Sequence, residues 1–202
     1  MTSSSRSLIL ASGSQTRLVL LTAAGLTVTA EPADLDESAC KVTWRAAGRT
    51  AENVALGLAE AKAAQISLRH PEALVIGADQ MLVCGEDWFD KPVDRNAAYR
   101  QLSALAGRTH FLMTAVAVLH DGEVLWSHGD RARMTMRPFS EAFLENYLNR
   151  TGEAVLSSVG AYQLEGLGVQ LFEKIEGDHF TILGLPLLPL LDFLRRSEVL
   201  KQ

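Results

Sequence analysis

The sequence has few of the features that mark secreted or membrane-bound proteins. Its 202 residues include only two cysteines, Cys40 and Cys84, which lie far apart and form no CxxC pair. Such cysteines are expected to be free thiols in a reducing compartment. No apolar run reaches the length that spans a membrane, and Leu8-Ile9-Leu10-Ala11 is too short for a signal sequence. We therefore expect a cytoplasmic protein without a membrane partner.

Basic residues and metal-binding histidine patterns are also scarce. The 19 Lys and Arg residues are outnumbered by 24 Asp and Glu, which gives a net charge of -5. This balance argues against a nucleic-acid partner but is compatible with a local phosphate pocket. The five histidines lack a spacing such as HxxxH, which argues against a zinc site. No repeat or linker divides the chain, so we expect one domain over residues 1–202, with 1–7 as a disordered lead-in.

The chain is organised around the stretch from Val75 to Pro92. The apolar run Leu74-Val75-Ile76 has the length of a buried strand, and Gly77-Ala78 is expected to end it. Asp79 follows, and a carboxylate after a buried strand is costly unless a cation or several donors meet it. With Lys91 further on, Asp79 suits a divalent metal and a phosphate chain. A polar turn with a surface lysine explains the same residues.

A second candidate site lies near the N-terminus. The run from Leu8 to Ala11 is typical of a buried strand, Ser12-Gly13-Ser14 is a small polar turn, and a helix is expected from about Gln15 to Ala24. A strand, turn and helix in this order present backbone N–H groups to an anion. Arg17 opposes the helix dipole, which suggests another role such as phosphate binding. A serine N-cap with a solvated arginine is the alternative.

Charged candidates also occur in the next two segments. Asp34-Leu35-Asp36-Glu37 has three carboxylates in four residues. These suit Mg²⁺ or Mn²⁺, but equally a solvated acidic loop. The segment from Lys41 to Arg49 is expected to be irregular. Ala51 to Arg69 is expected to be a strong helix, and Lys62 lies beside its apolar stripe, where it either meets a ligand or extends along the edge of the core.

The second half of the chain alternates strands and helices. Caps, periodicity and turn residues predict these elements. They are a helix over Arg95–Ala106 capped by Asp94, a strand over His110–Leu119, an Asp121-Gly122 turn, a returning strand over Val124–Met136, a helix from Glu141 to about Asn149 capped by Ser140, a glycine-rich loop over Ser158–Gly168, a strand over Val169–Ile175, and a final helix from Leu187 to about Arg196.

Together these motifs resemble the Maf family of nucleoside triphosphate pyrophosphatases, also called septum formation inhibitor proteins. The resemblance extends from Leu8 to about Arg196 and rests on the order and spacing of short motifs. These are Leu10-Ala11-Ser12-Gly13-Ser14 with Arg17, the acidic loop Asp34 to Glu37, Leu58-Ala59 with Lys62, Ile76-Gly77-Ala78-Asp79, Lys91-Pro92, Leu105-Ala106-Gly107-Arg108-Thr109-His110, Gly160-Ala161-Tyr162 and Gly184-Leu185-Pro186-Leu187.

The resemblance implies an α/β fold similar to that of Maf proteins and inosine triphosphatases. An elongated mixed sheet would be flanked by helices, with a nucleotide cleft between two lobes and a divalent cation, Mg²⁺ or Mn²⁺, as cofactor. The implied reaction cleaves a nucleoside triphosphate between its α and β phosphates, giving the monophosphate and pyrophosphate. Clearance of modified nucleotides and a link to cell-division arrest are also implied. A homodimer is compatible with the sequence.

The same resemblance suggests a role for each candidate residue. Asp79 would activate the attacking water, and Asp36 or Glu37 would join it in holding the metal. The cations of Arg17, Lys62 and Lys91 would neutralise the triphosphate, so the catalytic set would be Asp79, Lys62 and Lys91. The turn from Ser12 to Ser14 would donate N–H groups to the phosphates, and Gln80 and Glu165 would face the base.

The sequence departs from the commonest family pattern at several positions. Ser14 is followed by Gln15-Thr16-Arg17 instead of Pro-Arg-Arg, and Ser157-Ser158 replaces the usual Asp-Lys. Gln80 and Glu165 replace Thr and Gln, as in the subgroup that acts on 7-methyl-GTP and not on dTTP and UTP. A carboxylate can accept hydrogen bonds from a guanine edge. The lost cations leave a catalytically impaired nucleotide-binding regulator of septum formation as the alternative.

Overall fold

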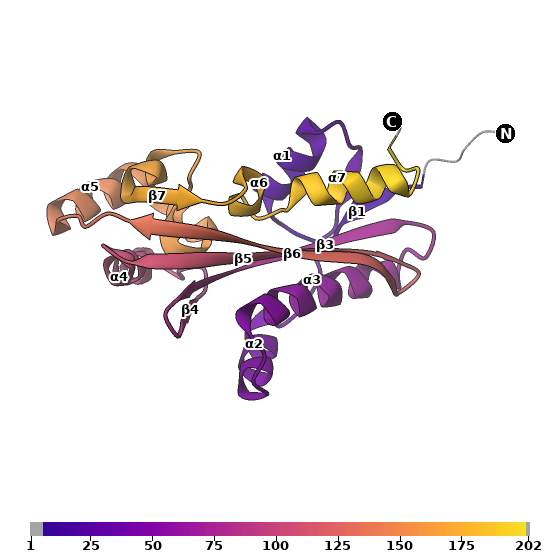
Figure 1. Ribbon diagram of the computed structural model, residues 1–202, viewed down its shortest axis with the longest axis horizontal. Helices are drawn as coiled ribbons and strands as arrows, with labels where there is room; N and C mark the ends of the chain where they lie inside the picture. Colours follow the sequence, from indigo (N-terminus) through magenta and orange to yellow (C-terminus); the bar gives the residue numbers. More distant parts are fainter. Residues whose placement is uncertain (1–5, 201–202) are drawn as a thin grey trace. The chain divides into compact units, whose positions relative to one another are not determined.

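A computed structural model describes residues 6–200 of the chain and confirms the predicted α/β class. Seven strands form one mixed sheet in the order β2-β1-β3-β5-β6-β7, with β4 paired to β3 (Figure 1). Strand β1 pairs in parallel with β2 and β3, whereas β3 with β4 and β6 with β7 are antiparallel. Residues 1–5 of the predicted lead-in lie outside the described residues.

The elements follow one another in an alternating order. The strands are β1 (Leu8–Leu10), β2 (Val28–Ala30), β3 (Leu74–Cys84), β4 (Asp87–Phe89), β5 (Thr109–His120), β6 (Glu123–Met136) and β7 (Phe172–Glu176). The α-helices are α1 (Gln15–Ala23), α2 (Glu37–Ala46), α3 (Ala51–Ser67), α4 (Arg95–Leu105), α5 (Glu141–Thr151), α6 (His179–Ile182) and α7 (Leu187–Arg196). Three short 3-10 helices are η1 (Gly152–Ser157), η2 (Val159–Ala161) and η3 (Leu167–Leu171).

The chain divides into two compact units, each assembled from several segments. Unit 1 comprises residues 1–79, 114–130 and 179–202, and unit 2 comprises 80–113 and 131–178. In unit 1, α1 and α7 cover one face of the strands and α2 and α3 lie on the other (Figure 1). Its core combines residues from β1, β3, β5, α1 and α7, among them Leu10, Leu21, Ile76, Val118 and Leu190. In unit 2, α4 packs against α5, η1 and η2.

The predicted helices owe their positions to local capping. Ser14, Thr50, Asp94 and Ser140 each accept a hydrogen bond from the backbone N–H three residues ahead, which satisfies a donor that the first helical turn leaves open. The predicted hairpin between β5 and β6 is confirmed, because Asp121 and Gly122 have φ values of 48° and 77°, the left-handed pair that a tight two-residue turn requires.

The prediction that Gly77-Ala78 ends a strand is wrong. Strand β3 continues to Cys84, so Asp79 lies within it and not after it. The small residues have another cause: a Cβ on Gly77 would lie 2.0 Å from the carbonyl oxygen of Ala59 in α3. What does end here is the parallel pairing with β1, because β1 stops at Leu10 opposite Ile76, and from Leu82 onward β3 pairs with β4 in antiparallel.

Three other predicted segments are corrected. The segment from Lys41 to Arg49 contains most of helix α2, whose N-cap is Asp36, and is not irregular. The strand predicted to start at Val169 starts at Phe172, because residues 167–171 form η3. The glycine-rich loop contains the 3-10 turn η2. Both cysteines are free, as predicted, and in residues 6–200 no helix has the length and apolarity needed to cross a membrane.

Candidate active site

The close approach of α3 to β3 determines where Lys62 lies. Gly77 lets the backbone of α3 pass directly over the strand, with Ala59 and Ala63 in contact. Lys62 is three residues beyond Ala59 and therefore lies on nearly the same helix face. Its side chain is only 9% exposed. A buried ammonium requires charged partners, which excludes the prediction that Lys62 merely extends along the edge of the core.

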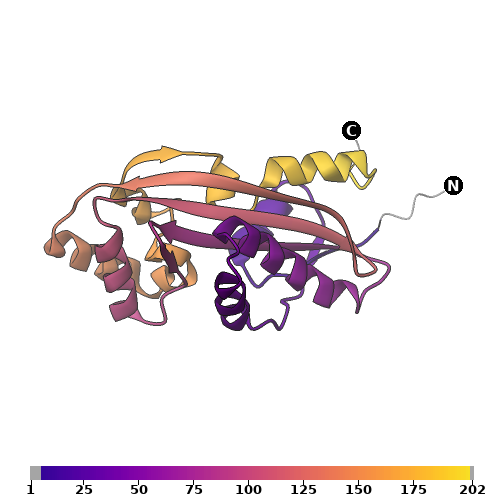
Figure 2. The same cartoon turned by 60° about the horizontal axis from the view of Figure 1, so that its bottom comes forward.

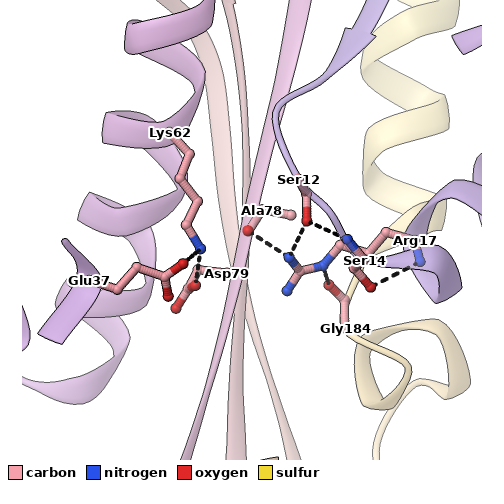
Figure 3. Close-up of polar contacts among 8 residues, drawn as sticks. All are labelled: Ser12, Ser14, Arg17, Glu37, Lys62, Ala78, Asp79 and Gly184. Atoms are coloured by element: carbon pink, nitrogen blue, oxygen red, sulfur yellow. Dashed lines mark hydrogen bonds and ion pairs between the residues drawn. The ribbon is translucent and has the colours of Figure 1, made fainter. Parts of the chain in front are cut away.

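Two carboxylates share the Lys62 ammonium (Figure 3). Nζ lies 2.6 Å from Oδ1 of Asp79 and 2.7 Å from Oε1 of Glu37. Asp79 comes from β3, Lys62 from α3 and Glu37 from the first turn of α2. Three separate elements of unit 1 are thus joined through one cation. We call Glu37, Lys62 and Asp79 the charged triad.

The two carboxylates of the triad have opposite pKa shifts. Burial raises the pKa of Asp79, and this effect exceeds the opposing attraction of Lys62 and Arg17. Burial also acts to raise the pKa of Glu37, but the attraction and hydrogen bond of Lys62, together with Lys41 and Arg17, outweigh it and lower the value. Glu37 is therefore the stronger acid, while Asp79 has the greater affinity for a proton.

One oxygen of Asp79 carries the clearest sign of an additional ligand. Oδ2 is buried and has no hydrogen-bond partner among residues 6–200. A buried acceptor without a donor is costly, and such groups are typical of sites that receive a proton, a water or an ion. Carboxylate oxygens are the ligands that Mg²⁺ and Mn²⁺ prefer, so Oδ2 with the half-exposed Glu37 carboxylate fits a divalent cation.

Asp36, the third predicted metal ligand, is engaged differently. Its Oδ1 accepts a hydrogen bond from the backbone N–H of Ala39 at 2.9 Å, which caps α2. No group of three or more His, Cys, Asp or Glu residues within 6–200 is arranged to hold a metal ion. The structure thus brings together Glu37 and Asp79, whereas Asp36 has a structural contact of its own.

Arg17 is buried and holds three segments of unit 1 together (Figure 3). Its Nε donates to the carbonyl of Gly184 at 2.8 Å, and its Nη1 donates to the carbonyl of Ala78 at 2.8 Å and to Oγ of Ser12 at 3.0 Å. The alternative of a solvated arginine is therefore wrong. The third nitrogen, Nη2, is joined to none of the residues drawn in Figure 3.

The two serine hydroxyl groups of the predicted turn already accept hydrogen bonds from within the protein. Oγ of Ser12 accepts from the backbone N–H of Ser14 at 3.3 Å as well as from Arg17. Oγ of Ser14 accepts from the backbone N–H of Arg17 at 3.4 Å and caps α1. Both serines therefore fix the turn in which they lie, and Ser12 also holds the guanidinium that contacts the backbone next to Asp79.

The remaining predicted residues lie in unit 2. Gln80 follows Asp79 in β3 and is half-buried, Lys91 is exposed just after β4, and Glu165 is exposed in the turn before η3. The carbonyl of Asp90, next to Lys91, accepts a hydrogen bond from Gln101 at 2.8 Å. The roles predicted for Gln80, Lys91 and Glu165 stay predictions.

Sequence reasoning missed the acceptors that position Arg17 and a buried cluster in unit 2. Gly184 has a φ of 96°, a conformation that favours glycine, and its carbonyl receives Arg17 from 167 residues away. In unit 2, Nε2 of His110 lies 2.8 Å from Oη of Tyr162, and Tyr147 donates to the carbonyl of Ala161. In the sequence, Gly184, His110 and Tyr162 are marked only as members of short family motifs. A motif does not show which residues contact one another in the fold.

Comparison with known proteins identifies the family. A family model described as Maf-like protein matches residues 7–197. The chain belongs to the Maf family. A Paramagnetospirillum magneticum member named nucleoside triphosphate pyrophosphatase is 56% identical over 189 residues, which are 94% of this chain and 97% of that protein.

Relatives with a second name are almost equally similar to this Maf protein. A Rhizobium etli protein named 7-methyl-GTP pyrophosphatase is 54% identical over 188 residues, 93% of this chain and 94% of its own length. A Rhodospirillum rubrum protein named nucleoside triphosphate pyrophosphatase is 53% identical over 192 residues, 95% of each chain. Identity values this close do not distinguish the two substrate classes.

Proposed function

We propose that this Maf protein is a nucleoside triphosphate pyrophosphatase that releases a nucleoside monophosphate and pyrophosphate. The observation that carries the proposal is the unpartnered Oδ2 of Asp79 beside a buried Lys62. A structural ion pair has no need of an open buried acceptor, since leaving it unsatisfied destabilises the fold. The names of relatives at 53–56% identity support the same reaction.

Asp79 is the group that takes the proton from the attacking water. The water oxygen forms a bond to the α phosphorus, the bond from that phosphorus to the bridging oxygen breaks, and its electron pair leaves with pyrophosphate. The proton released from the water passes to Oδ2, the oxygen that Lys62 does not contact. The raised pKa of Asp79 strengthens it as a base once it is ionised.

Lys62 and Arg17 orient that base from two directions. Lys62 holds Oδ1 at 2.6 Å, which leaves Oδ2 as the free oxygen of the carboxylate. Arg17 fixes the carbonyl of Ala78, the residue before Asp79, so the backbone that carries the base is also held. Nη2 of Arg17, and the positive charge of Lys62, are the groups of unit 1 that would meet phosphate oxygens.

A divalent cation, Mg²⁺ or Mn²⁺, is the proposed cofactor. Asp79 and Glu37 would hold it, because their oxygens suit a hard cation and each carboxylate oxygen has two lone pairs, so that Oδ2 of Asp79 could face the ion with one and take the proton with the other. When bound, such an ion neutralises charge on the phosphates and lowers the pKa of coordinated water. Asp36 uses Oδ1 for the N-cap of α2, so Oδ2 is the oxygen that it would contribute.

We propose that the preferred substrate is a nucleoside triphosphate whose base is a guanine methylated at N7. The support is the carboxylate of Glu165 with Gln80, together with relatives named 7-methyl-GTP pyrophosphatase. A carboxylate accepts hydrogen bonds from the N–H donors of guanine but meets only repulsion from a pyrimidine carbonyl. The positive charge of an N7-methylated base adds attraction.

A substrate panel tests the reaction and the base together. We expect 7-methyl-GTP, with Mg²⁺ or Mn²⁺, to release pyrophosphate faster than GTP, dTTP or UTP, measured by a pyrophosphate-specific assay. Release of inorganic phosphate without pyrophosphate would contradict the cleavage position. A wild type that prefers dTTP would contradict the proposed base.

The variant Glu165→Gln separates base reading from a general role. If Glu165 contacts the base, the ratio of kcat/KM values for 7-methyl-GTP and dTTP should shift toward dTTP, because the amide can donate to a pyrimidine carbonyl. Measurement of both substrates with the same enzyme preparation gives the ratio directly. An equal loss on all four nucleotides would show that Glu165 does not read the base.

A further inference from the structure

Helix α2 carries one member of the charged triad, Glu37, but contributes no buried side chain to the core. Glu37 is its first residue, yet none of its ten residues is buried. Figure 2 shows α2 beside the start of α3, extending away from the strands of unit 1. A helix without buried side chains is not held by the core. Specific contacts must therefore keep Glu37 at Lys62.

The face of α2 that turns toward α3 is readable from its exposure pattern. The half-buried residues are Glu37, Cys40, Lys41 and Trp44, while the other six are exposed. A spacing of three, four and seven residues places these side chains on one face. Glu37 and Trp44 are therefore the two ends of a single contact stripe, about two turns apart.

Trp44 rests on a gap in α3 that only glycine provides. A Cβ at Gly57 would lie 2.9 Å from Cζ3 of the Trp44 ring and 3.1 Å from its Cη2. The guanidinium of Arg49 lies over the ring, 4.9 Å from its centroid. Gly57 is the one glycine inside α3, where glycine is otherwise unfavourable. Its presence is explained by the tryptophan that it admits.

We infer that Trp44 is a positioning residue that, by resting on Gly57, sets Glu37 against Lys62. This inference rests on the proposed function for its kinetic consequence. The indole anchors one end of the stripe, and the ion pair between Glu37 and Lys62, at 2.7 Å, is formed at the other. Without the contact between Trp44 and Gly57, α2 can move relative to α3. Glu37 then leaves the triad, while the ion pair between Lys62 and Asp79 is kept.

The kinetic test is a double-mutant cycle between Trp44 and Glu37. Trp44→Ala should lower kcat/KM by roughly tenfold or more, as expected when a catalytic group is misplaced, and Trp44→Phe should restore most of it. In a Glu37→Gln background, Trp44→Ala should have no further effect. Val42→Ala is the matched control, since Val42 is 71% exposed on the same helix. Additive losses of Trp44→Ala and Glu37→Gln would overturn the inference.

Gly57→Ala distinguishes positioning from general stability. Alanine favours helix formation, so α3 itself should be stabilised and the melting temperature should not fall. The added methyl group nevertheless displaces the indole, and kcat/KM should drop as in Trp44→Ala. A Gly57→Ala protein with wild-type kinetics would contradict the role of this contact.

Hydrogen exchange of the free protein tests the anchor without any activity. Trp44→Ala should accelerate amide exchange in residues 37–46 and leave residues 51–67 unchanged, as measured by mass spectrometry. Unchanged exchange in 37–46 would refute the anchor even if the enzyme is a pyrophosphatase. Conversely, a wild type that hydrolyses no nucleotide would refute the proposed function, while faster exchange in 37–46 would still support the anchor.

Discussion

The two units solve the problem of buried polar groups in opposite ways. In unit 1, Lys62, Asp79 and Glu37 are ionisable groups in mutual contact, and one oxygen of Asp79 is left without a partner. In unit 2, His110 is fully buried with its Nε2 at Tyr162, and burial lowers its pKa to about 4. His110 is therefore neutral near pH 7. Nδ1 of His110 also lacks a hydrogen-bond partner within residues 6–200, but an unpartnered oxygen on an ionised carboxylate costs more than an unpartnered nitrogen on a neutral ring, so the open acceptor of unit 1 is the stronger sign of a ligand.

The largest expected effect is that of removing the charge of Asp79. Asp79→Asn is nearly isosteric and keeps an oxygen for Lys62, so the fold should be retained. Turnover should fall by on the order of 10³-fold, as for loss of a general base. Pyrophosphate release and circular dichroism measure the two properties. Asp94→Asn is the control, because Asn also caps α4.

If Asp79→Asn hydrolyses nucleotides at the wild-type rate, Asp79 is not the proton acceptor. The charged cluster of unit 1 would then be structural, like the neutral cluster of unit 2, and the contrast between the units would disappear.

Removing the shared cation should cost stability as well as activity. Lys62→Ala leaves two carboxylates facing each other, one of them buried, and the free energy of unfolding should fall by about 3 kcal/mol. Urea denaturation measures the change. Arg133→Ala is the control, since its ion pair with Glu176 is exposed and should contribute less than about 1 kcal/mol. Equal losses of unfolding free energy in Lys62→Ala and Arg133→Ala would show that the buried ion pairs of Lys62 contribute no more to stability than an exposed one.

The neutral cluster of unit 2 predicts a dependence of stability on pH. The pKa of His110 lies at about 4 in the folded protein and near 6.5 in the unfolded chain, so the unfolded state binds more protons below pH 6.5. Stability should therefore be lost as pH falls from 6.5 toward 4, by about 3 kcal/mol from this residue. Thermal unfolding across this range measures the loss.

His110→Phe is the comparison that isolates this effect. The variant cannot titrate at position 110, so its stability should change less between pH 6.5 and 4 than that of the wild type. The raised pKa of Asp79 acts in the opposite direction, but it is common to both proteins and cancels in the difference. If the stability of the two proteins changed equally with pH, protonation of His110 would not destabilise the fold.

Local features could be predicted from the sequence because their causes are local. The caps Asp94 and Ser140 and the turn Asp121-Gly122 act within a few residues, and each was found where expected. The serine cap of α1, left open as an alternative, is formed by Ser14. The family motif also indicated Asp79 and Lys62 as partners of one site, and their contact at 2.6 Å is present.

The errors arise where the cause lies far away in the chain. Gly77-Ala78 looked like the end of a strand because the sequence does not show that the backbone of Ala59, in helix α3, lies against Gly77. The alternative of a solvated Arg17 failed because the sequence does not show that Gly184, 167 residues away, accepts a hydrogen bond from its Nε. Helix α2 was missed because its contact stripe mixes the charged Glu37 and Lys41 with Cys40 and Trp44, so that no run of apolar residues marks it in the sequence.

The close contact at Gly77 limits which amino acids this fold tolerates at position 77. Every residue other than glycine adds a Cβ, which would overlap the Ala59 carbonyl, a backbone atom that cannot rotate away. In a library with every codon randomised, position 77 should return glycine alone, whereas exposed Val93 should return nearly any residue. Conservation at this position would then record a spacing between two backbones and carry no information about chemistry, although it stands two residues from Asp79.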